Sequence, residues 1–167
     1  FLNNSIFLFT LGNLLIIVGS IPSIIPLISF TTWDIAIKFS FIFSFASGLL
    51  GLYTYSIPKL LGKELVENIT SYMLYGIGSA VVVISLAING IVSGYLWTAG
   101  ANAGNFTSFG EGYQIVWKAI SRFHSIVALG SLLIFTSLLI FSINTLRSVT
   151  SGSIVPQEIL VGVKENE

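Results

Sequence analysis

Four long apolar stretches constrain the fold of this chain more than any other feature of its sequence. They cover residues 5–30, 35–57, 70–97 and 124–145. Each is long enough to cross the hydrocarbon layer of a membrane, which is about 30 Å thick and needs about 20 residues of helix. Only 8% of the 167 residues are charged and 54% are hydrophobic, whereas roughly 25% are charged in an average soluble domain. We therefore predict an all-α, polytopic membrane protein, a bundle of about four transmembrane helices.

Prolines mark the ends of the first two stretches. Pro22 and Pro26 each remove a backbone donor, so the first helix should kink or loosen near its end. Pro58 precedes the charged sequence "KLLGKELVENIT", so we expect the second helix to end there. The first stretch has no basic residues before it and is longer than the apolar region of a signal peptide, so we interpret it as a spanning helix.

A glycine-rich loop and an amphipathic segment separate the third and fourth stretches. The segment, residues 113–123, reads "YQIVWKAISRF" and predicts a short interfacial helix before the last span. Tyr113, Trp117 and Arg122 suit the headgroup region of a membrane, where aromatic rings and long basic side chains are enriched. We interpret these three residues as interfacial anchors.

The chain divides into a four-helix transmembrane domain, residues 1–147, and a short polar C-terminal tail, residues 148–167. Basic residues are more numerous in the connections on one side of the predicted membrane than on the other. By the positive-inside rule, both termini of this multi-pass plasma-membrane protein should be cytoplasmic. The first side carries Lys59, Lys63, Arg147 and Lys164, and the second carries Lys118 and Arg122 with Lys38 reaching toward it.

Small residues recur at helical intervals along the third stretch. Small side chains let a second helix approach closely within lipid, so we predict a helix-packing face there. We expect the Asn89 amide to hydrogen-bond across this interface, the alternative being contact with a cofactor or an ion. The predicted packing residues are Gly76, Ala87, Asn89, Gly90 and Gly94.

The residues that could perform redox or transport chemistry are scarce. Haems held by spanning helices need histidine pairs, and copper or iron centres need further imidazoles, yet the sequence has one histidine and no cysteine. No acidic residue falls near the middle of a predicted span, which argues against proton-driven transport through a buried carboxylate. The formal net charge of zero argues against a nucleic-acid partner. We assign no catalytic residue, no metal ligand and no cofactor ligand.

Two ionisable residues lie near the ends of predicted spans. Lys38 is a few residues into the second stretch and can extend its amine to the interface, as a snorkelling anchor. His124 follows Phe123 at the start of the last stretch, where an imidazole can reach water or headgroups. We interpret His124 as an interfacial anchor. The alternative is a single axial ligand to a haem shared with a partner chain.

The order of several short motifs is similar to that of a known family. Residues 85–148 contain, in order, a small-residue segment ending in Gly94-Tyr95-Leu96-Trp97, a loop, a surface helix and a final helix. Leu129-Gly130-Ser131 lies near the start of that final helix and Asn144 near its end, while Thr32-Trp33 and Pro58 bracket the second stretch. This order resembles the last four helices of the catalytic subunit of C-family (cbb-type) haem-copper oxidases and nitric oxide reductases.

The sequence departs from that family at its haem ligands. The family has a His-x-His pair at the start of the helix that corresponds to the second stretch, where this chain has Ala36-Ile37-Lys38-Phe39-Ser40. The resemblance therefore implies a non-catalytic integral subunit of a respiratory oxidase or reductase complex, with haem in a partner subunit. Its partners would be other membrane subunits of that hetero-oligomer and the lipid bilayer, with a quinone nearby. The alternative function is a small transporter or sensor component unrelated to respiration.

Overall fold

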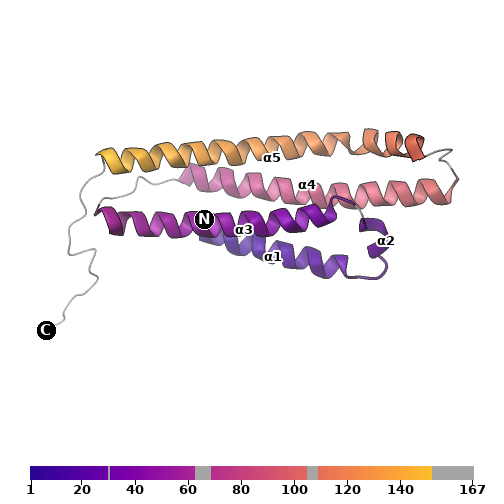
Figure 1. Cartoon of the computed structure of the whole chain (residues 1–167), viewed down its shortest axis with the longest axis horizontal. Coiled ribbons are helices and arrows are strands. Elements are labelled where there is room, and N and C mark those ends of the chain that lie inside the picture. Colours follow the sequence, from indigo (N-terminus) through magenta and orange to yellow (C-terminus); the bar gives the residue numbers. More distant parts are fainter. Residues whose placement is uncertain (30, 63–68, 105–108, 152–167) are drawn as a thin grey trace.

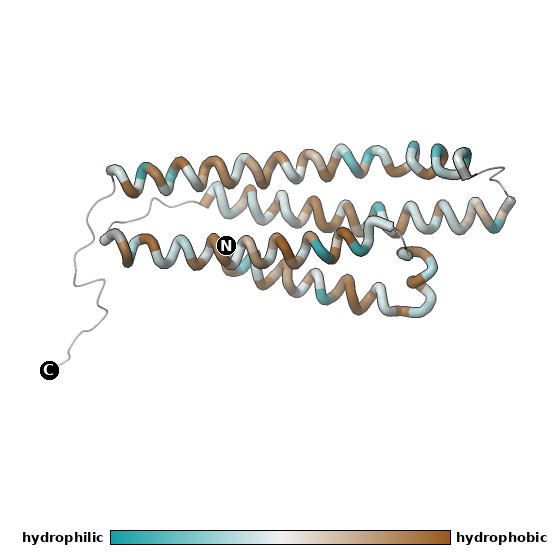
Figure 2. Tube along the Cα trace, viewed as in Figure 1, coloured by the Kyte–Doolittle hydropathy of each residue, from teal (hydrophilic) through white to brown (hydrophobic). Residues whose placement is uncertain are grey.

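Helices make up nearly all of the described chain. The computed structural model describes residues 1–29, 31–62, 69–104 and 109–151, and this part contains no strand (Figure 1). Four of its helices are long and apolar enough to cross a membrane, and Figure 2 shows apolar residues along each of them. The predicted all-α, multi-pass membrane bundle is confirmed. The helices are α1 (Leu2–Gly19), α2 (Ile25–Ile28), α3 (Trp33–Leu61), α4 (Ile69–Asn102) and α5 (Phe109–Ser151).

The helix α4 holds the bundle together. It packs against α5 along one side and against α2 and α3 on the other, while α1 packs mainly against α3 (Figure 1). With 34 and 43 residues, α4 and α5 are roughly 51 and 64 Å long, at 1.5 Å per residue. Both therefore exceed the hydrocarbon thickness. The apolar core lies between α1, α3 and α4 and includes Leu8, Leu15, Trp33, Ala36, Val82, Val83 and Leu86.

The helices α1 and α3, which correspond to the first two apolar stretches, end at other residues than predicted. The helix α1 stops at Gly19 and the chain turns before the single turn of α2. Pro22 cannot donate a backbone hydrogen bond and disfavours the helical conformation at the residue before it, so the chain breaks instead of kinking. The predicted end of α3 at Pro58 is wrong, because α3 continues to Leu61. Gly62 caps this end of α3, because its φ of 62° suits glycine and its N–H donates to the Pro58 carbonyl.

The segment 113–123 is helical, but it is not a separate interfacial helix. It forms the first turns of α5, which runs without interruption into the last span. Val116, Gly130 and Ser137 are buried on the same side of α5, and their separations of seven residues or multiples of seven keep one stripe of the helix against α4. The helix also extends past the predicted domain boundary at residue 147, and residues 152–167 of the predicted tail lie outside the described residues.

Candidate functional site

Two serines and two glycines form a close contact between α4 and α5. Ser71 Oγ donates to the Ser137 carbonyl at 2.9 Å, and Ser137 Oγ donates back to the Ser71 carbonyl at 2.7 Å. Gly78 follows Ser71 by seven residues and Gly130 precedes Ser137 by seven. A Cβ added to Gly78 would lie 2.8 Å from the Gly130 carbonyl oxygen, and one added to Gly130 would lie 2.9 Å from the Gly78 oxygen. We call these four residues the α4–α5 seam. Such reciprocal contacts of small residues allow two helix backbones to approach closely in lipid.

A second set of hydroxyls joins α3 to α1. Ser40, Ser44 and Ser47 are buried on one face of α3. Each donates its hydroxyl to a backbone carbonyl of the other segment, at Leu8, Ser5 and Phe1 respectively. A hydroxyl that bonds a carbonyl of a neighbouring helix satisfies its own donor where no water is present and ties the two helices together. These serines therefore serve contacts between helices.

Two predicted packing glycines lie where α4 meets the α2–α3 segment. A Cβ on Gly90 would be 2.7 Å from the backbone nitrogen of Trp33, and one on Gly94 would overlap the Leu27 carbonyl oxygen. The Thr32 hydroxyl donates to the Leu86 carbonyl on the same side of α4, at 2.8 Å. At these two positions the backbone of the chain's own α2–α3 segment occupies the space that a side chain would need.

Gly76 and Ala87, two further predicted packing residues of α4, also contact other parts of the same chain. Gly76 faces the side chain of Asn4, whose amide donates to the Tyr72 carbonyl at 3.2 Å. Ala87 is buried in the core cluster. Gly78 and the Ser71–Ser137 pair are not among the predicted packing residues. Small residues seven apart, at 71, 78 and 85 in α4 and at 130 and 137 in α5, are the signal that could have identified the α4–α5 seam.

Asn89 lies in the interior of the bundle without the expected hydrogen bond. Its side chain is 0% exposed, and neither amide atom has a partner among the described residues. Asn89 is five helical turns from Ser71 and so faces the same side of α4, toward α5.

The predicted interfacial anchors lie on exposed faces. Tyr113 and Trp117 are 54% and 47% exposed, and their rings stack with centroids 6.1 Å apart. The His124 ring contacts Trp117, with centroids 4.9 Å apart, and its Nδ1 is 3.2 Å from the Ile120 carbonyl oxygen of its own helix. Lys38 and Arg122 are exposed as well. Three of the five predicted anchors thus form one aromatic cluster at the beginning of α5.

The described part of the chain contains no group of three or more His, Cys, Asp or Glu side chains arranged to hold a metal ion. Over the same residues, serines, Thr145 and Asn89 are buried. Tyr75 adds a buried hydroxyl and Trp33 a buried indole N–H, and the Trp33 N–H has no hydrogen-bond partner among the described residues. No protein-family model matches the sequence, and no curated protein matches it. The contacts of this site hold helices against one another through serine hydroxyls and glycines.

Proposed function

We propose that this chain is a non-catalytic integral subunit of a respiratory terminal oxidase or reductase complex, in which it packs against a haem-bearing subunit. The observation that carries the proposal is the use of the buried hydroxyls. Those of Ser40, Ser71 and Ser137 all donate to carbonyls of neighbouring helices, which is a use suited to a structural role. The order of motifs over residues 85–148 supports the respiratory assignment through its resemblance to C-family oxidases.

The proposal places the chain in the plasma membrane with both termini in the cytoplasm. The outer surfaces of α1, α3 and α5 carry large exposed apolar side chains, which in a complex would face lipid or the partner subunits. Haem would belong to the partner, and a quinone would bind near the interface between the subunits. The exposed cluster of Trp117 and His124 would then anchor α5 at the membrane surface.

Affinity purification of the tagged chain from its native membrane tests this proposal. Mild detergent preserves contacts between membrane subunits, and mass spectrometry identifies the proteins that co-purify. We expect a larger multi-helix subunit that carries haem-ligating histidine pairs. Recovery of the chain alone, or with partners that bind no redox cofactor, would contradict the respiratory assignment.

One observation favours the second candidate, a small transporter or sensor component. The Asn89 amide is fully enclosed and lacks a protein partner among the described residues, and polar groups within a membrane interior often mark the path of a solute or ion. Reconstitution of the purified chain in vesicles loaded with an ion-sensitive dye tests this candidate. Ion flux that is lost in Asn89→Leu would favour the second candidate over the first.

A further inference from the structure

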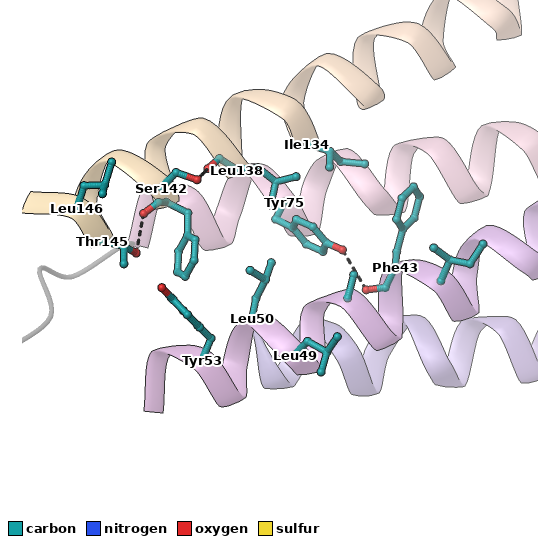
Figure 3. Close-up of a pocket in the computed structure, with 13 residues that line it drawn as sticks. Phe43, Leu49, Leu50, Tyr53, Tyr75, Ile134, Leu138, Ser142, Thr145 and Leu146 are labelled. Carbon is teal, nitrogen blue, oxygen red and sulfur yellow. Dashed lines mark hydrogen bonds between the residues drawn. The ribbon is translucent and has the colours of Figure 1, made fainter. Parts of the chain in front are cut away.

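The groove between α3 and α5 and the outer face of α1 differ in what they require of a neighbour. Apolar side chains such as Phe43, Leu50 and Leu138 line the groove, and the Tyr75 hydroxyl beside them already donates to the Phe43 carbonyl at 3.1 Å (Figure 3). Any hydrocarbon can cover such a surface. The outer face of α1 instead carries polar side chains along an apolar helix, and these need a polar neighbour.

The residues on this face of α1 have the spacing of a coiled coil. Their separations alternate between three and four residues from the first turn of α1 to its C-cap, and none of the six residues is buried. Such alternation keeps all of them on one side of a helix. Four of the six are polar. We call them the α1 stripe, and they are Asn3, Ile6, Thr10, Asn13, Ile17 and Ser20.

The α1 stripe faces away from the bundle. The buried residues of α1 are Leu8, Gly12 and Leu15. Each is two positions from a residue of the stripe and so lies about 200° round the helix from it. The buried side faces α3, against which α1 mainly packs, and α1 lies at the edge of the bundle (Figure 1). Ile6 and Ile17 are accordingly 60% and 69% exposed, so a second helix has room to lie along the stripe.

Two polar residues of the stripe lie near the middle of the span. The helix α1 has 18 residues, so it is roughly 27 Å long and does not exceed a hydrocarbon layer of about 30 Å. Thr10 and Asn13 are within about 4 Å of its midpoint. The Asn13 amide donates to the Phe9 carbonyl of its own helix, which uses one of its two N–H groups and not its carbonyl oxygen. Lipid tails cannot bond these groups, whereas a polar side chain of a neighbouring helix can.

A second copy of this chain matches the α1 stripe at every position. Two copies with the same orientation in the membrane are related by a twofold axis along the membrane normal, so their α1 helices run parallel and each stripe residue meets its counterpart. The stripe has no charged residue, so no pair repels. Amides and hydroxyls both donate and accept hydrogen bonds. We propose that two copies of this chain associate through the α1 stripe, with their Asn13 amides hydrogen-bonded to each other.

Cysteine cross-linking in native membranes tests which face of α1 meets the second copy. The sequence has no cysteine, so each variant carries a single thiol. A disulfide requires Cα atoms within about 7 Å of each other, so a membrane-permeant oxidant should convert Ile6→Cys and Ile17→Cys to a species of twice the chain mass.

Phe7→Cys and Leu14→Cys are the matched controls for this experiment. Phe7 and Leu14 are exposed to a similar extent, 52% and 53%, but each is about 100° round the helix from the stripe residue before it. These variants should remain single chains. Equal cross-linking of all four variants would overturn the proposal, as would the absence of cross-linking in Ile6→Cys and Ile17→Cys.

Removal of the Asn13 amide tests whether it holds the two copies together. Energy transfer between donor-labelled and acceptor-labelled chains in vesicles of palmitoyl-oleoyl phosphatidylcholine gives the dissociation constant of the pair. Asn13→Leu should raise this constant about tenfold, as expected for the loss of an interhelical hydrogen bond in lipid. The variant should still fold, because the amide bonds a carbonyl of its own helix. An unchanged constant would overturn the proposal, as would wild-type chains that transfer no more energy than randomly placed ones.

Thr10→Val and Thr136→Val form a second matched pair. Both threonines are exposed, and each donates its hydroxyl to a carbonyl of its own helix, but only Thr10 belongs to the α1 stripe. Thr10→Val should raise the dissociation constant about threefold, and Thr136→Val should leave it unchanged. Equal effects of the two substitutions would contradict association through the stripe.

Discussion

Replacing Gly78 by alanine should destabilise the bundle through the α4–α5 seam. The added Cβ would lie 2.8 Å from the Gly130 carbonyl oxygen, 2.9 Å from Ile134 Cγ1 and 3.1 Å from the Ile134 nitrogen. Ordinary contacts need about 3.5 Å, and two of the three atoms belong to the backbone, so α5 as a whole must move. Overpacking of this kind costs about 1–3 kcal/mol. The better helix propensity of alanine offsets about 1 kcal/mol, which leaves a net loss of up to about 2 kcal/mol.

Gly110→Ala is the matched control for this prediction. Gly110 is also in a helix, and a Cβ there would meet no atom within 4 Å, so alanine should leave the free energy of unfolding unchanged or raise it by up to about 1 kcal/mol. The measurement is reversible unfolding in mixed micelles, followed by circular dichroism. If Gly78→Ala unfolds at the same or higher denaturant than Gly110→Ala, the seam does not hold the two helices as described.

Three further predictions concern other contacts and the single histidine. Ser71→Ala and Ser137→Ala should each lower the free energy of unfolding by about 0.6–1.7 kcal/mol. The double variant should lower it by less than the sum, because each hydroxyl bonds the other serine's carbonyl. Additive losses in the same micelle assay would refute the pairing. Gly94→Leu should displace α2 from α4 and reduce co-purification with the partner subunits, since Leu27 occupies the space of the new side chain; unchanged recovery of the complex would contradict this. His124→Gln should leave the haem spectrum and turnover of the parent complex intact, because the ring is exposed and contacts Trp117; loss of a haem band from an assembled complex would show that His124 is a ligand.

The number and location of the spans could be predicted from the sequence because apolar length is nearly sufficient evidence in a membrane protein. The ends of the helices were harder to predict. Pro58 removes only the backbone hydrogen bond that residue 58 would donate to the Thr54 carbonyl. Because Pro58 is close to the C-terminal end of α3, the helix continues past it to Leu61. Pro22 follows a helix that has already reached Gly19, and there the chain breaks completely. One proline thus lies beyond the end of its helix, and the other lies within the last turn of its helix.

The packing residues were only partly accessible from sequence. Gly90 and Gly94 could be identified as small residues, but sequence alone could not indicate that the α2–α3 segment of the same chain covers them. The segment 113–123 is continuous with α5, and its Val116 is buried. The exposed Tyr113 and Trp117 of the same segment had indicated a separate helix at the membrane surface. The Asn89 amide was expected to have a partner, and whether a buried amide finds one depends on the register of two helices, which no local pattern specifies.

The most direct test of the central proposal is a reduced-minus-oxidised absorbance spectrum, recorded on the purified native complex and on the chain after its separation from the partners. Haem bands in the complex, together with less than stoichiometric haem in the separated and still folded chain, are the predicted result. A Soret band near one haem per chain that remains after separation would contradict a non-catalytic subunit. The absence of haem from a complex that is otherwise intact would contradict its place in a respiratory oxidase or reductase.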